Sequence, residues 1–249
     1  MRLTVVGSSG SFPGPGNPAS CYLVTAGATR VVLDLGNGAL GALASYLSLD
    51  DVDAVLLSHL HADHCLDLCP YYVYRRYHPD GRRPRLPVYG PAGVAARLAR
   101  AYDLDPEPGM TGEYEFREWA DGQTVHIGEL SVTVTQVVHP VTSYAMRLEH
   151  HGRSLVYSGD TAPSTALADL AAGADLLLAE ASFHEGRDDV PELHMTGRQA
   201  AATATKAGAT RLVLTHLPPW NDPGRTLGEA RTAWSGPLAL AHPGDVFDV

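Results

Sequence analysis

Three histidines and one aspartate lie within six positions, directly after an apolar run that is typical of a buried strand. The run Ala54–Ser58 leads into His59-Leu60-His61-Ala62-Asp63-His64. Residues two apart in an extended segment point to the same side, so His59 and His61 can converge on one ion. Asp63 and His64 fall where the chain turns into a helix, so they can face a second point nearby. Because imidazole and carboxylate groups suit zinc and similar ions, the segment predicts two divalent metal ions.

The same pattern recurs at three later strand ends. His139 closes the apolar run Val132–Val138, Asp160 comes shortly after another run, and His216 follows Leu212–Thr215. Taken singly, each of these three residues is equally well explained as a turn residue or a helix cap. Together with the first segment, they place metal-ligating side chains at four strand ends.

Short β-branched runs alternate with alanine-rich stretches along the chain, which predicts an α/β fold built in layers. Around Glu129–Glu149 strands follow one another without a helix, so part of the sheet should be antiparallel. The expected strands are Leu3–Gly7, Cys21–Thr25, Val31–Asp34, Ala54–Ser58, Pro87–Gly90, Ser131–Val138, Tyr144–Glu149, Ser154–Ser158, Leu176–Ala179 and Leu212–Thr215. The expected helices are Gly38–Leu47, His64–Tyr74, Ala92–Tyr102, Thr165–Ala172, Thr196–Ala207 and Leu227–Trp234. No repeat or long linker divides the chain, so we expect one domain over residues 1–249.

Charge and cysteine content narrow the function classes. The chain has 28 acidic and 18 basic side chains, a formal charge of −10, which argues against binding to long nucleic acids. Three cysteines and the lack of an apolar signal or membrane segment favour a cytoplasmic protein without membrane contact. Five arginines between positions 75 and 85 form either a solvated loop or an anion-facing edge. The tyrosines beside them indicate helix packing, with a homodimer contact as the second interpretation: Tyr71, Tyr72, Tyr74 and Tyr77.

The ligand pattern resembles the metallo-β-lactamase-fold hydrolases, whose HxHxDH motif matches His59–His64 and whose later ligands match in order. The resemblance covers nearly the whole chain and implies a four-layer αββα sandwich with two mixed β-sheets and the metals at one edge. It assigns one metal to His59, His61 and His139. It assigns the other to Asp63, His64 and His216, with Asp160 bridging both. Zinc is the expected ion, with manganese or iron as alternatives.

Two further segments resemble the ribonuclease Z-like phosphodiesterase branch of that family. They are Glu180-Ala181-Ser182-Phe183 and His194-Met195-Thr196-Gly197. The branch pairs this glutamate with this histidine near the scissile phosphate. The chain looks closest to the atypical cyclic-nucleotide phosphodiesterases of actinobacteria. It lacks the long glycine- and proline-rich arm with which transfer-RNA-processing members grip RNA.

These features predict hydrolysis of a small phosphodiester, with a 3′,5′-cyclic nucleotide such as cAMP as the expected substrate. Two cations would lower the pKa of a shared water, and the resulting hydroxide would attack phosphorus. We expect Asp63 to orient this nucleophile and His194, held by Glu180, to protonate the leaving oxygen. The serines of the glycine-rich N-terminal turn are candidates for phosphate binding, although a tight turn explains the glycines equally well: Ser8, Ser9 and Ser11.

Two alternative activities stay open at this point. The first is a ribonuclease Z-type endonuclease that processes transfer-RNA 3′ ends. The second is a hydrolase of carboxylic esters, lactones or thioesters on the same fold, which would not need a proton donor placed as His194 is. A binding protein on a retired hydrolase scaffold should have lost ligands, whereas all seven positions here are filled.

Overall fold

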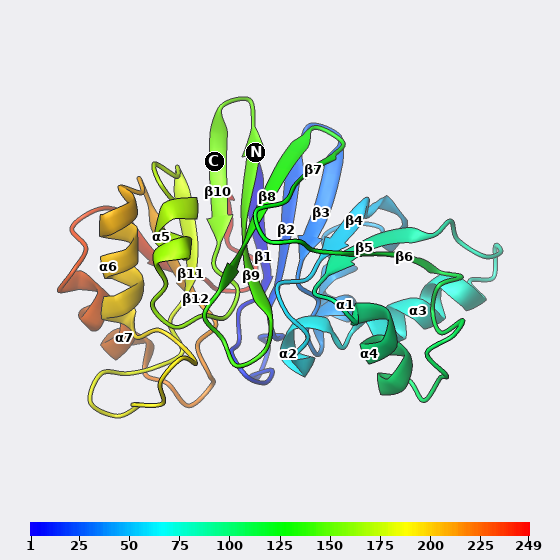
Figure 1. The fold of residues 1–249 in the computed structure, drawn as a ribbon, viewed down its shortest axis with the longest axis horizontal. Coiled ribbons are helices and arrows are strands. Elements are labelled where there is room, and N and C mark those ends of the chain that lie inside the picture. Colours follow the sequence, from blue (N-terminus) through cyan, green and yellow to red (C-terminus); the bar gives the residue numbers. More distant parts are fainter.

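The computed structural model describes residues 1–249 and shows two β-sheets that pack face to face, with helices on both outer sides (Figure 1). The first sheet has the order β14-β1-β2-β3-β4-β5-β6, and the second has the order β13-β12-β11-β10-β9-β8-β7. In each sheet one half is antiparallel and the other half is parallel. The predicted αββα sandwich with two mixed sheets is therefore confirmed.

The strands have the following bounds. The first sheet consists of β1 (Arg2–Gly7), β2 (Cys21–Ala26), β3 (Thr29–Leu33), β4 (Ala54–Leu56), β5 (Leu86–Gly90), β6 (Tyr114–Glu118) and β14 (Val246–Asp248). The second sheet consists of β7 (Thr124–Ile127), β8 (Leu130–Val137), β9 (Ser143–His150), β10 (Arg153–Tyr157), β11 (Leu176–Glu180), β12 (Leu212–Thr215) and β13 (Leu238–Leu240). The predicted antiparallel part is the hairpin of β8 and β9.

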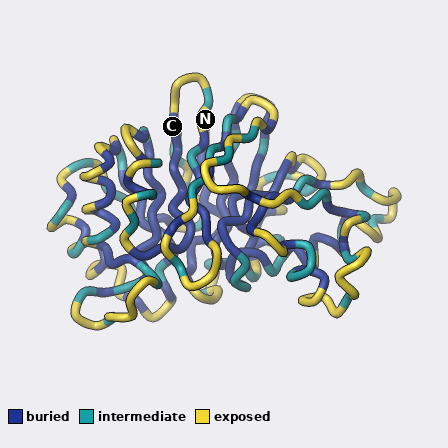
Figure 2. Tube along the Cα trace, viewed as in Figure 1, coloured by how far each residue is buried: buried dark blue, intermediate teal, exposed yellow.

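Helices cover the outer face of each sheet. Those on the first sheet are α1 (Ala39–Leu43), α2 (Ala62–Cys65), α3 (Leu68–Tyr77) and α4 (Val94–Ala101), with a 3-10 turn, η1 (Leu49–Asp51). Those on the second sheet are α5 (Thr165–Leu170), α6 (Gly197–Ala207) and α7 (Pro223–Arg231). Figure 2 shows that buried positions run through the central strands, while exposed ones gather in the outer connections. None of these helices has the length and apolarity that a membrane-spanning segment requires.

Local sequence explains how the best-defined helix begins and ends. Thr196 and Gln199 form a capping box at the start of α6, in which each side chain bonds the other residue's backbone N–H. Gly208 ends the helix in the left-handed conformation that glycine adopts without strain. The predicted helix at Thr196–Ala207 is thus confirmed, with Thr196 as its cap.

Three predicted helices are wrong in their extent. The expected helix Gly38–Leu47 is shortened to α1, which ends at Leu43, and the expected helix Leu227–Trp234 is α7, which begins at Pro223 and ends at Arg231. The expected helix His64–Tyr74 is two helices, because α2 ends at Cys65 and α3 begins at Leu68. The turn between them is bonded to the segment that follows β3. The backbone N–H of Asp67 donates to Leu35 O, and the Asp67 carboxylate accepts from the N–H of Leu40. These bonds fix the bend that brings α2 to the edge of the sheet.

Four strands were not expected from the sequence, and all four are the outermost strands of their sheets: β6, β7, β13 and β14. An edge strand pairs on one side only and need not carry the long apolar run that marks a central strand. Polar side chains interrupt β6, β7 and β14, and β13 is apolar but only three residues long. In β14, for example, the first and last residues are exposed. Such strands are difficult to predict from their own sequence, because they form only by pairing with a neighbouring strand.

Candidate metal centre

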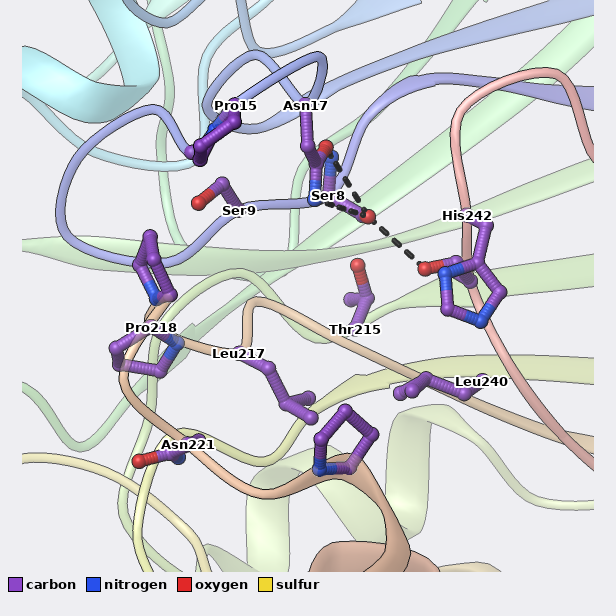
Figure 3. A pocket seen from close by; sticks show the side chains of 14 residues that line it. Ser8, Ser9, Pro15, Asn17, Thr215, Leu217, Pro218, Asn221, Leu240 and His242 are labelled. Carbon is purple, nitrogen blue, oxygen red and sulfur yellow. Dashed lines mark hydrogen bonds between the residues drawn. The ribbon is translucent and has the colours of Figure 1, made fainter.

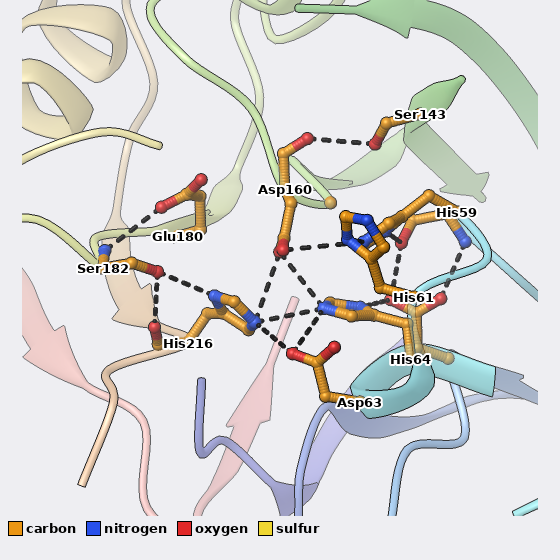
Figure 4. Close-up of polar contacts among 12 residues, drawn as sticks. His59, His61, Asp63, His64, Ser143, Asp160, Glu180, Ser182 and His216 are labelled. Atoms are coloured by element: carbon orange, nitrogen blue, oxygen red, sulfur yellow. Dashed lines mark hydrogen bonds and ion pairs between the residues drawn. The ribbon is translucent and has the colours of Figure 1, made fainter. Parts of the chain in front are cut away.

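The predicted ligand residues meet at one edge of the two sheets because the strands before them end there. Figure 4 shows six of the seven side chains: His59, His61, Asp63, His64, Asp160 and His216. Strands β10, β11 and β12 are parallel, and β9 is antiparallel to both β10 and β8. Strands β8, β10 and β12 therefore run in one direction. His139, Asp160 and His216, which follow them, are delivered to the same edge.

The first sheet contributes the remaining four residues through the connection between β4 and α2. His61 is extended, with φ −68° and ψ 155°, and stands at the N-cap of α2. His59 lies two residues before it, and ring nitrogens of the two are 3.0 Å apart. The expected convergence of these two side chains is what the structure shows. Asp63 and His64 lie in α2 and are buried.

The seven residues gather into two groups that share Asp160. In each group every residue offers a ligand atom within 4.8 Å of the others. The first group is His59, His61, His139 and Asp160, and the second is Asp63, His64, Asp160 and His216. This is the grouping that the family resemblance implies, with the shared aspartate between two ion positions.

Donor atoms in the second group have the spacing of a tetrahedral ion's ligands. His64 Nε2 lies 3.0 Å from His216 Nε2 and 3.3 Å from Asp160 Oδ1. Asp63 Oδ2 lies 3.4 Å from His64 Nε2 and 3.2 Å from His216 Nε2. A tetrahedral ion about 2.0 Å from each ligand keeps its ligands about 3.3 Å apart. The donor set therefore fits a divalent cation without rearrangement.

The polar chemistry of these groups also fits a cation. Asp160 Oδ1 is buried without any hydrogen-bond partner, which is costly unless a cation neutralises it. Burial lowers the pKa of His59 well below its ordinary value, so this ring is neutral, as a ligand must be. Burial also disfavours the charged form of His64, but Asp160, Asp34 and Asp63 raise its pKa well above the ordinary value. The carboxylates around His64 thus favour a positive charge at this position, and a bound divalent ion would supply it.

Each ligand imidazole except His61 has its other ring nitrogen bonded within the protein. Nδ1 of His59 faces Ser58 Oγ at 3.1 Å, and Nδ1 of His139 faces the backbone oxygen of Leu193 at 2.9 Å. Ser182 Oγ lies 2.7 Å from Nδ1 of His216. Such bonds fix the tautomer and leave Nε2 for the ion.

Asp34 is the functional residue that the sequence reasoning missed. Its Oδ2 lies 2.7 Å from His64 Nδ1 and accepts from the hydroxyls of Ser58 and Tyr157. Its Oδ1 accepts from the backbone N–H of Ser58 at 2.7 Å. Asp34 is fully buried and has a left-handed backbone, with φ 54°. Strain of this kind persists where surrounding bonds hold it and is frequent at functional sites.

Replacing Asp34 should weaken metal binding without removing a ligand. In Asp34→Asn the amide cannot hold the His64 ring as the carboxylate does, and we expect metal affinity to fall by about 10- to 100-fold. Competition with a fluorescent chelator measures this change. Asp175→Asn is the matched control, because Asp175 also accepts from a serine N–H and hydroxyl, those of Ser154, away from the metal groups. Equal affinities in the two variants would contradict the assigned role.

Glu180 and His194 form the predicted pair beside the metal groups. Glu180 is fully buried at the end of β11, and its Oε1 lies 2.8 Å from His194 Nδ1. Backbone N–H groups of Thr161 and Ser182 also bind this carboxylate. Burial disfavours the charged form of His194, but the adjacent Glu180 raises its pKa to about 9. The His194 ring centroid lies 5.6 Å from those of both His139 and His216, so the ring adjoins one ligand of each group.

The N-terminal turn packs against His216, one of the candidate metal ligands. Gly10 packs on His216, where an added Cβ would meet the backbone oxygen at 2.2 Å, so only glycine allows this approach. The hydroxyls of Ser8 and Ser9 donate to the backbone oxygens of Ala241 and Phe12. Both serines line a separate cavity of about 220 Å³ (Figure 3), and Ser11 is exposed. The structure does not bring these three hydroxyls to the metal groups, and their contact with substrate stays a prediction.

Comparison with known proteins agrees with this geometry. The family profile described as Beta-lactamase superfamily domain matches residues 29–217. An uncharacterized protein of Mycobacterium leprae is 42% identical over 100% of this chain and 89% of its own length. A ribonuclease Z of Mycolicibacterium gilvum is 34% identical over 90% of this chain and 87% of its own.

A solved structure extends the likeness to three dimensions. The probable metallo-hydrolase YhfI of Bacillus subtilis is 30% identical over 100% of both chains. Its crystal structure, described as a metallo-beta-lactamase fold protein, superposes with a TM-score of 0.88 and covers 99% of each chain. The whole length of the chain, including the edge strands, thus shares its arrangement with that protein.

Proposed function

The chain belongs to the beta-lactamase superfamily, in its ribonuclease Z-like branch of metal-dependent hydrolases, and on that premise we propose that it hydrolyses a small phosphodiester. The proposed substrate class is the 3′,5′-cyclic nucleotides, with cAMP as the representative. The observation that carries this proposal is the Glu180–His194 pair, because a phosphodiester with an alkoxide leaving group needs a proton donor. Esters and lactones have less need of one.

We propose that the two groups of ligand atoms each hold a divalent ion and that this ion is zinc. The first group offers three imidazoles and one carboxylate, and the second offers two of each. Sets that combine imidazole and carboxylate ligands suit zinc, while manganese and iron are the alternatives. When bound, the ions would neutralise charge on the phosphoryl oxygens and lower the pKa of water at the site.

Two side chains of the protein have roles in proton transfer: Asp63 orients the attacking water, and His194 donates a proton to the leaving oxygen. Burial disfavours ionised Asp63, but His64 and His216 lower its pKa well below the ordinary value, so it is a carboxylate at neutral pH. It can therefore accept a hydrogen bond from the attacking water and orient it. His194 can donate its Nε2 proton to the leaving oxygen while Glu180 holds Nδ1. Divalent ions nearby would bring the pKa of His194 down from about 9 towards neutrality, where a general acid works best.

Charge beside His194 supports a small substrate over a long polyanion. A cavity of about 190 Å³ is lined by His194 and by three acidic residues, Asp188, Asp189 and Glu192. Only Asp188 has an ion-pair partner, Arg187. Uncompensated carboxylates at this position would repel the successive phosphates of an RNA strand.

A substrate panel on metal-loaded protein tests the proposal. We expect 3′,5′-cAMP to be opened to a single nucleoside monophosphate, with kcat/KM on the order of 100-fold above that for a precursor transfer-RNA or a thioester. Liquid chromatography of the nucleotide products and gel analysis of the transcript supply the readouts. Metal-loaded protein that leaves cyclic nucleotides intact but trims the transcript would establish the endonuclease instead. Hydrolysis of the thioester alone would establish the ester hydrolase.

A further inference from the structure

Three of the five arginines between positions 75 and 85 have carboxylate partners. Arg76 and Arg82 both bind the buried Glu113, at 3.1 and 2.6 Å. Arg83 binds Asp50 at 2.8 Å. Each of these three cations is therefore held in an ion pair within the protein. The two arginines that form no ion pair are Arg75 and Arg85.

Arg75 is a buried cation without a matching anion. Only 4% of the residue is exposed, on α3. Its guanidinium donates to the backbone oxygen of Pro84 and lies 5.5 Å from the centre of the Tyr71 ring. Its Nε has no hydrogen-bond partner. A buried charge is unfavourable unless an opposite charge accompanies it, and no carboxylate lies within ion-pair distance of Arg75, so its charge is uncompensated.

A cavity beside Arg75 has room for that anion. Its volume is about 390 Å³, within the range of small-molecule pockets, and three arginines are among the residues that line it: Arg75, Arg83 and Arg85. The two carboxylates on the wall are already engaged, since Asp50 binds Arg83 and Asp53 accepts from the backbone N–H of Arg30 at 2.7 Å. Three cations against two anions leave one positive charge in excess. We call this space the Arg75 cavity.

We propose that the Arg75 cavity binds a small phosphate-bearing anion at a site separate from the metal centre. Guanidinium groups offer paired N–H donors whose fork matches phosphate oxygens, and Nε of both Arg75 and Arg83 is without a partner. Val52 and Leu86 supply an apolar wall for an organic substituent. None of the seven metal-site residues lines the cavity. The lining residues come from η1 and the residues after it, from α3, and from the connection that leads into β5.

Calorimetric titration of metal-loaded protein with inorganic phosphate tests this site. Arg85 is exposed and forms no ion pair, so Arg85→Glu should fold normally while reversing one charge on the cavity wall. We expect this variant to weaken one class of phosphate sites by at least about tenfold, since one charge-assisted hydrogen bond is lost and a repulsive charge is added. Arg100→Glu is the matched control, an exposed arginine of α4 with the same charge change outside the cavity, and should alter affinity less than about twofold.

The two variants separate this site from other phosphate binding. If Arg85→Glu and Arg100→Glu bind phosphate identically, the anion binds at the metal centre or adventitiously only, and the proposal is overturned. Titration with 5′-AMP identifies the source of the phosphate group. Tighter binding of 5′-AMP than of phosphate, lost in Arg85→Glu, assigns a phosphomonoester, whereas equal binding assigns free phosphate. Because binding is measured and not turnover, the result is independent of the proposed phosphodiesterase activity.

Discussion

His64→Ala should abolish hydrolysis of 3′,5′-cAMP, with kcat/KM lowered by at least about 10³-fold. His64 Nε2 lies within 3.4 Å of donor atoms of the three other residues in its group. Without this nitrogen, two carboxylates and one imidazole are left around the second ion position, and Asp34 loses the ring that it holds. We expect the variant to retain close to one metal ion per chain where the wild type binds two. Metal content by mass spectrometry and product formation by chromatography measure both effects, and chelator treatment of the wild type should reproduce the loss of activity.

His150→Ala is the control for this variant. His150 belongs to a half-exposed group with Glu129 and His151, which has ligand-type residues in reach of one another but lies outside the proposed centre. Its replacement should change neither metal content nor rate. A His64→Ala protein that keeps two ions and full activity would show that the second group is not a metal site.

His194→Ala should lower kcat for cAMP by about 10²- to 10³-fold while leaving metal content unchanged. The reason is the loss of a proton donor held by Glu180 at 2.8 Å beside both metal groups. A substrate whose leaving group needs no proton should be far less affected. Bis(p-nitrophenyl) phosphate releases p-nitrophenolate, a stabilised anion that needs no proton. We therefore expect the rate of its hydrolysis to fall by only about tenfold or less.

The comparison of the two substrates distinguishes chemistry from structure. Loss of folding or metal would reduce both rates together, whereas loss of the donor reduces only the one with the alkoxide leaving group. His126→Ala is the control, since His126 is exposed on β7 and belongs to neither metal group, and should behave as the wild type. Equal loss on both substrates in His194→Ala would refute the role of proton donor.

The candidate ligand residues were predictable because each follows an apolar strand or lies in the short segment directly after one. A central strand has a continuous apolar run, so the polar residue after it is conspicuous, and His59 and His61 add the two-residue spacing of extended chain. Asp34 follows β3 in the same way, yet it contacts His64 rather than an ion position. Its partner is 30 positions away in sequence. Such outer contacts depend on tertiary packing, which one-dimensional patterns do not contain.

The five arginines between positions 75 and 85 are a second case in which the sequence did not reveal tertiary contacts. From sequence, a solvated loop and an anion-facing edge were equal interpretations. The distinction depends on Glu113 and Asp50, which form ion pairs with three of the five arginines and come from distant positions. Once these pairs are known, the charge of Arg75 is the one left unbalanced inside the protein.

The division of the metal groups between two sheets has a consequence for folding kinetics. The first group takes His59 and His61 from the first sheet and His139 from the second, and the other group is divided in the same way. Neither half of the chain alone can present a complete ion site. During refolding, high-affinity metal uptake should therefore coincide with docking of the two sheets and lag behind the formation of secondary structure. Unfolding should be slower in the presence of bound ions, because separation of the sheets must break coordination first.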